Sequence, residues 1–285
     1  MKKIVVAVLF VLLFMFVYMF FQVGISFIYG IVLAIKLIFE SRGNFDPSVF
    51  LDMQTIILEA SLYLMLVSVI VSLPIYYIIC KLRNQNIFTV CEFNKISFKT
   101  TFLTAVLGIA TSIFLSCVLS FIPINEFFPE HNELIYSLMG GHNLFEILLV
   151  TGLVAPFIEE VIFRGLILKE LKKIMPISLA VVIQAILFGL YHFNPLQIIY
   201  ASLLGILLGL VAVWTRSIWS SIILHAFINT TSTFLGTFLT DENIMNNIYT
   251  FLIVCIVIIV AIVIYLKRNS KGKLNNVNDR IPNNI

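Results

Sequence analysis

Long apolar stretches, separated by short polar segments, dominate this chain from its start to about residue 266. At about 20 residues, most stretches are long enough for a helix to cross the hydrocarbon core of a bilayer. Only helices and closed barrels satisfy their backbone hydrogen bonds in lipid, and unbroken apolar runs favour helices. We therefore predict an all-α, polytopic membrane protein of about eight transmembrane helices. The expected spans are residues 4–39, 54–80, 98–122, a fourth beginning at 144, then 177–193, 195–215, 218–239 and 249–266.

The chain divides into four predicted regions. Residues 1–143 hold three N-terminal spans with their loops, 144–238 form the core that carries the chemistry, and 239–268 hold the last span. The first span begins like a signal peptide, but its apolar run continues to residue 39 without a small-residue cleavage motif, so we expect an uncleaved helix. Residues 269–285 are polar, and we expect a disordered cytoplasmic tail.

Basic residues alternate between the predicted connections. They precede the first span and follow the second, fourth, sixth and eighth, whereas the other connections are acidic or neutral. Because positively charged loops stay in the cytoplasm, this pattern places both termini there. The lysine- and asparagine-rich ends fit a bacterial plasma membrane.

The composition is also that of a membrane protein. Hydrophobic residues make up 60% of it, charged residues 12%, and the mean hydropathy is +1.06, unlike a soluble domain. The net charge of +3 does not indicate nucleic-acid binding, because the basic residues lie in short loops where they report orientation. The four cysteines show neither metal-binding nor redox spacing, and we expect them to pack as small apolar residues.

Several polar residues lie deep inside predicted spans, where one charge costs about 2.5–3.5 kcal/mol and marks a functional site by default. They are Glu159, Glu160 and Arg164 in the fourth span, His192 at the end of the fifth, and His225 and Asn229 in the seventh. Gln184, in the fifth span, is a lesser case.

Helical spacing distinguishes the roles of the first three of these residues. Glu160 and Arg164 are four positions apart, so they share a helix face and can form an ion pair. Glu159 points about 100° away from Glu160 and has no such partner in its own helix. Glu159 is therefore the candidate general base, although the two carboxylates could exchange roles.

The histidines follow the same spacing. His225 and Asn229 place an imidazole and an amide on one face, a good donor pair for an oxyanion, and Phe188 lies four positions before His192. A single intramembrane histidine is more simply explained by a hydrogen bond to a neighbouring carbonyl group. Taken together, however, these residues supply the base, imidazole and oxyanion donors that a hydrolase needs.

Two glycines in the sixth span, Gly205 and Gly209, have the small-xxx-small spacing of closely packed transmembrane helices. The pattern is short enough that a chance pair is an equally good explanation.

The blocks "EEVIFR", "FGLYH" and "HAFIN" follow one another on the predicted helices. They match the pattern EExxxR, FxxxH and HxxxN, so residues 144–238 resemble the CPBP family of intramembrane endopeptidases, also called the Abi or CAAX protease-like family. The resemblance implies about eight helices around an intramembrane active-site cavity. It also implies cleavage of a peptide bond in a membrane-associated peptide or protein, which is lipidated in the prenyl-protein members. Bacterial relatives are linked to bacteriocin immunity.

On this basis we expect Glu159, with His192, to polarise a water that attacks the substrate carbonyl. His225 and Asn229 would hold the oxyanion, while Glu160 and Arg164 keep the fourth span in register. A zinc-dependent alternative uses Glu159, His192 and His225 as ligands. We favour the mechanism without a metal cofactor, because an HExxH motif is absent and Asn229 suits an oxyanion better than zinc.

Two other classes of function remain open. A non-catalytic membrane scaffold or immunity factor would have no need of a base and oxyanion donors. A transporter with a proton relay would be expected to show repeated halves or paired broken helices, and the sequence shows neither.

Overall fold

The computed structural model describes residues 2–40, 48–131, 140–238 and 241–278, and the elements in these ranges are helices. The longer ones are α1 (Lys2–Glu40), α3 (Ser61–Leu82), α5 (Phe98–Leu119), α12 (Pro195–Thr215), α13 (Ile218–Phe238) and α14 (Asp241–Asn278). The shorter ones are α2 (Ser48–Glu59), α4 (Ile87–Val90), α6 (Ile124–Phe127) and α11 (Ile177–Leu190). The predicted all-α class is confirmed.

Among the described residues, five stretches are long and apolar enough to cross a membrane: Lys2–Glu40, Ser61–Leu82, Phe98–Leu119, Pro195–Thr215 and Asn247–Ser270. They overlap five of the predicted spans. The second predicted span, 54–80, is divided at Ala60 between α2 and α3. The other three predicted spans fall on residues 144–171, on α11 and on α13, and the total of eight stays a prediction. The outer helices expose large apolar side chains such as Phe27 and Leu203, as expected of surfaces that face lipid.

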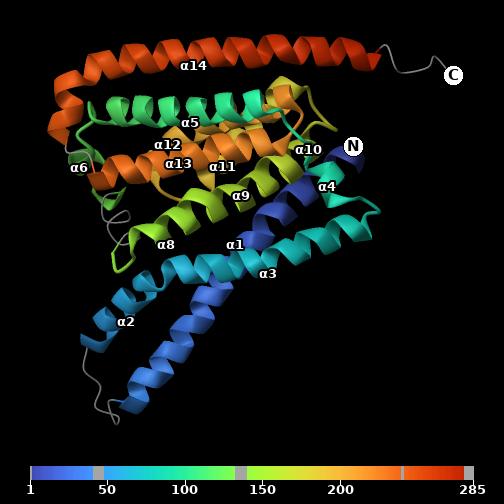
Figure 1. Ribbon diagram of the computed structural model, residues 1–285. Coiled ribbons are helices and arrows are strands. Elements are labelled where there is room, and N and C mark those ends of the chain that lie inside the picture. Colours follow the sequence, from blue (N-terminus) through green and yellow to red (C-terminus); the bar gives the residue numbers. More distant parts are fainter. Residues whose placement is uncertain (1, 41–47, 132–139, 239–240, 279–285) are drawn as a thin grey trace.

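The helices form a layered bundle with the fourth predicted span at its centre (Figure 1). Helix α5 packs between α13 and α14, α11 packs against α12, and α1 packs against α3. The N-terminal end of α1 and the C-terminal end of α14 lie at the same end of the bundle, where α4 and α10 (Leu168–Leu171) also lie (Figure 1). This arrangement agrees with an even number of crossings.

The last helix extends beyond its predicted end. Helix α14 continues to Asn278, past residue 269 where the polar tail was expected to begin. Residues 279–285 of that expected tail lie outside the described residues.

The fourth predicted span is a continuous series of five helical segments. They are α8 (Leu144–Leu149), η1 (Val150–Val154), α9 (Ala155–Glu160), η2 (Val161–Ile167) and α10. The series begins at Asn143, whose side chain accepts a hydrogen bond from the Glu146 amide in a reciprocal capping box. Segments η1 and η2 are π-helical. This geometry is rare in proteins overall, and where it occurs it is often at a functional site. The two glutamates therefore lie at the end of a short α-helix between two wider turns.

Helices α11 and α12 approach closely along the two glycines of α12. A Cβ atom on Gly205 would lie 3.0 Å from Ala185, and one on Gly209 would lie 2.8 Å from the Gln184 side chain. The small-xxx-small spacing thus marks a real contact between helices. Helix α12 itself begins at Asn194, whose side chain accepts from the Gln197 amide, with Pro195 in the first turn.

Candidate active site

The predicted ion pair between Glu160 and Arg164 is present in the centre of the bundle. An Arg164 Nη1 atom lies 2.7 Å from Glu160 Oε1, and both side chains are fully buried. The guanidinium also donates to the Gly205 carbonyl at 3.3 Å and stacks on the Phe188 ring, 4.3 Å from its centroid. Arg164 therefore connects the fourth predicted span to both α11 and α12.

Glu159 is free of ion pairs within its own helix, as its spacing predicts. Its side chain keeps 15% of its surface exposed, whereas that of Glu160 keeps none. Its nearest ionisable partner among the described contacts is His225, whose Nε2 atom lies 3.7 Å from Glu159 Oε2. Of the two carboxylates, Glu159 is thus the one that a water or a substrate can reach.

His225 lies between the two glutamates. Its Nδ1 atom is 2.8 Å from Glu160 Oε1, and its Nε2 atom faces Glu159. An imidazole held through Nδ1 by a carboxylate has a fixed ring orientation, the arrangement used to position catalytic histidines. The sequence grouped His225 with Asn229; the structure places it in contact with both carboxylates as well.

Asn229 lies one turn further along α13. Its Nδ2 atom donates to the Thr151 carbonyl at 2.9 Å, which joins α13 to η1. The primary amide carries two N–H donors, so one remains for another acceptor. The close contact of Gly152 with Thr230, where a Cβ would lie 2.9 Å from Oγ1, brings the same two segments together.

His192 and His225 approach the same aromatic ring. The Phe188 centroid lies 4.9 Å from that of His192 and 5.7 Å from that of His225, and both contacts are edge-on. The Nδ1 atom of His192 is 2.9 Å from the Phe188 carbonyl, the local hydrogen bond that a solitary helix histidine is expected to make. With Nδ1–H donating there, the Nε2 atom of a neutral His192 is an acceptor.

Two tyrosines border the site and were missed from the sequence. Tyr18 on α1 and Tyr191, directly after α11, stack with centroids 6.3 Å apart. Tyr191 also contacts Phe163, with centroids 5.5 Å apart, and Phe163 lies against Phe188. Within the described part of the chain, both hydroxyl groups are buried without a hydrogen-bond partner. Buried hydroxyls normally find a partner, so this pair can offer hydrogen bonds to a water or a ligand. An apolar run gives no signal that one of its tyrosines faces the site.

The geometry gives no support to the alternative zinc set of Glu159, His192 and His225. Across the described ranges, no three His, Cys, Asp or Glu side chains gather closely enough to hold a metal ion. We therefore derive no step through zinc.

The fold and these contacts define a helical membrane protein with a buried cluster of carboxylates, histidines and an amide. Residues 141–231 match the family model described as Type II CAAX prenyl endopeptidase Rce1-like. This match to an Rce1-like domain agrees with the resemblance to the CAAX endopeptidase (CPBP) family that the three sequence blocks indicated. The match supports peptidase activity of the CAAX-type intramembrane class in general. No curated protein and no solved structure shows significant similarity to this chain.

Proposed function

We propose that this protein cleaves a peptide bond of a membrane-associated peptide or protein with a water activated by Glu159. The observation that carries the proposal is the position of His225, held by the buried Glu160–Arg164 pair on one side and facing the accessible Glu159 carboxylate on the other. A structural ion pair alone has no need of a second carboxylate at intramembrane depth.

In the proposed reaction, Glu159 takes a proton from the water while the water oxygen bonds to the substrate carbonyl carbon. The Nε2 atom of His192 accepts a hydrogen bond from the same water. The remaining amide N–H of Asn229 and the Nε2–H of His225 donate to the oxyanion that forms. Since Nδ1 of His225 already donates to Glu160, His225 acts in this step as imidazolium. Collapse of the intermediate breaks the C–N bond, and the proton on Glu159 passes to the leaving amine.

We further propose that both termini face the cytoplasm and that the chain resides in a plasma membrane. Two observations support the orientation: the alternation of basic and acidic connections along the sequence, and the position of the two terminal helix ends at one end of the bundle (Figure 1).

Cleavage by the purified protein tests this function directly. Reporter peptides with and without a prenylated cysteine are reconstituted with wild-type protein, and products are identified by mass spectrometry. We expect cleavage that persists in a zinc chelator. Loss on chelation with recovery on zinc addition would assign the reaction to a metalloprotease, and absence of cleavage with both peptide classes would favour a non-catalytic scaffold.

Replacing Asn229 with alanine should lower kcat by about 10²–10³-fold with little change in KM, because an oxyanion donor acts mainly in the transition state. Steady-state kinetics on the reporter peptide measures both parameters. Ser232, exposed one turn further along α13, provides a matched control, and Ser232→Ala should keep full activity. A rise in KM alone in Asn229→Ala would instead indicate a role in substrate binding.

A further inference from the structure

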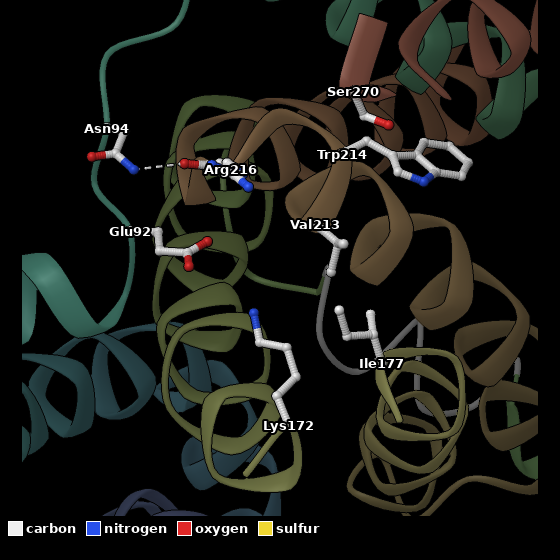
Figure 2. Close-up of a pocket in the computed structure, with 8 residues that line it drawn as sticks. All are labelled: Glu92, Asn94, Lys172, Ile177, Val213, Trp214, Arg216 and Ser270. Atoms are coloured by element: carbon white, nitrogen blue, oxygen red, sulfur yellow. Dashed lines mark hydrogen bonds between the residues drawn. The ribbon is translucent and has the colours of Figure 1, made fainter. Parts of the chain in front are cut away.

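A second polar site lies away from the carboxylate cluster, where the ends of several helices meet. It is a cavity of about 420 Å³ whose walls include Glu92, Lys172, Val213, Trp214, Arg216 and Ser270 (Figure 2). These residues come from the loop after α4, the end of α10, the end of α12 and the C-terminal part of α14. The reaction proposed above uses none of them.

The cavity lies at the level where membrane spans end. The candidate span Pro195–Thr215 ends directly before Arg216, and the span Asn247–Ser270 ends at a cavity residue. The span Phe98–Leu119 begins shortly after Asn94, which also lines the cavity. Phospholipid phosphates occupy this level of a bilayer, and tryptophan is enriched there, as Trp214 illustrates.

Two cations in the cavity lack a close anionic partner. Among the described residues, neither Lys172 nor Arg216 has a carboxylate within 4.0 Å, whereas Glu92 already pairs with Lys169 at 3.4 Å. Figure 2 shows the Lys172 ammonium directed into the cavity, toward Glu92 and Arg216. Burial lowers the pKa of Lys172, and the Glu92 carboxylate only partly opposes this.

The position of Arg216 is fixed by the backbone. It ends α12 in a left-handed conformation, with φ of 54°, and its carbonyl accepts from the Asn94 side chain at 2.7 Å (Figure 2). The positive charge of an arginine at a helix C-terminus interacts favourably with the negative end of the helix dipole. Lys172 also lies at a helix C-terminus, that of α10, but the helix dipoles do not explain why both side chains line one cavity.

We propose that this cavity binds the phosphate group of an anionic glycerophospholipid. Lys172 and Arg216 neutralise the phosphate, and Val213 and Trp214 contact the glycerol end of the acyl chains. The Glu92 carboxylate accepts a hydrogen bond from a headgroup hydroxyl. Basic pockets between transmembrane helices at the interface are the sites where proteins hold such headgroups.

Tryptophan fluorescence provides the test, because the chain has only two tryptophans, Trp214 and Trp219. In the Trp219→Phe protein, brominated phosphatidylglycerol added to detergent micelles should quench Trp214 saturably, and brominated phosphatidylcholine should do so far less. The double variant Lys172→Gln, Arg216→Gln should raise the half-saturating mole fraction of brominated phosphatidylglycerol by about thirtyfold. Each cation removed accounts for a factor of about five. Lys81→Gln is the control: it removes an exposed cation outside the cavity and should have no effect.

Three outcomes would overturn the proposal: equal quenching by the two lipids, unchanged quenching in the double variant, or a raised KM for peptide with unchanged lipid quenching. Inorganic phosphate is added as a competitor, and displacement at low millimolar concentration would assign the same phosphate site to a soluble ligand. Thermal midpoints are recorded for each variant. If the double variant does not fold, the two single variants, each expected to lose about fivefold, replace it.

Discussion

Glu159→Gln is expected to bring peptide cleavage below detection while the thermal midpoint of the protein stays within the range of control variants. Glutamine preserves the size and one hydrogen-bond acceptor of the side chain but cannot take a proton from water. A general base contributes about 10²–10⁴-fold to such a rate. The Glu159 side chain is partly exposed, and its contact with His225 is 3.7 Å long, whereas Glu160 holds the same ring at 2.8 Å. The contact between α9 and α13 should therefore survive the loss of the Glu159 charge. Cleavage is measured on the reporter peptide, and unfolding is followed in the same detergent.

The control is Glu126→Gln, the same chemical change on an exposed residue of α6, which should retain wild-type activity. Full activity in Glu159→Gln would rule out the proposed base. Activity lost in Glu160→Gln but retained in Glu159→Gln would show that the two carboxylates exchange the roles assigned to them.

Arg164→Met is expected to reduce the free energy of unfolding by about 3–5 kcal/mol, the usual cost of leaving one partner of a buried ion pair without the other. The loss follows from the full burial of the pair and from the contacts that the guanidinium makes with Gly205 and Phe188. Thermal or chemical unfolding in detergent measures the effect.

The double variant Glu160→Gln, Arg164→Met separates charge from packing. Removing both charges leaves no unpaired ion in the interior, so part of the lost stability should return. Cleavage should not return with it, because His225 loses the carboxylate that orients it. A double variant as unstable as Arg164→Met would mean that packing of the guanidinium, and not the ion pair, dominates.

Some parts of this site could be predicted from the sequence because they depend on one helix. Glu160 and Arg164 meet because residues four apart share a face, and this holds although Arg164 lies in the wider turns of η2. The apolar runs likewise predict the long helices, since the length needed to cross a bilayer leaves little freedom.

Other parts depend on contacts between distant segments, which spacing does not encode. The contact of His225 with both glutamates joins α13 to α9, and the stacking of Tyr18 on Tyr191 joins α1 to the end of α11. Within the π-helical segments, Gly152 and Gly165 lie against Thr230 and Cys91 at distances that leave no room for a Cβ, and these contacts also join distant parts of the chain. The cavity of Lys172 and Arg216 is assembled from helix ends, whose meeting cannot be deduced from any single span.

Helix α1 has a consequence for the membrane around the protein. Its 39 residues extend over about 58 Å, roughly twice the thickness of a hydrocarbon core, and large apolar side chains are exposed as far as Phe39. Such hydrophobic mismatch is relieved by tilting the helix or by thickening the lipid around it. Tyr18 lies on this helix and stacks on Tyr191, which borders the site through Phe163, so a change in tilt would move this contact. Bilayer thickness thereby becomes a variable that acts on the site from outside the protein.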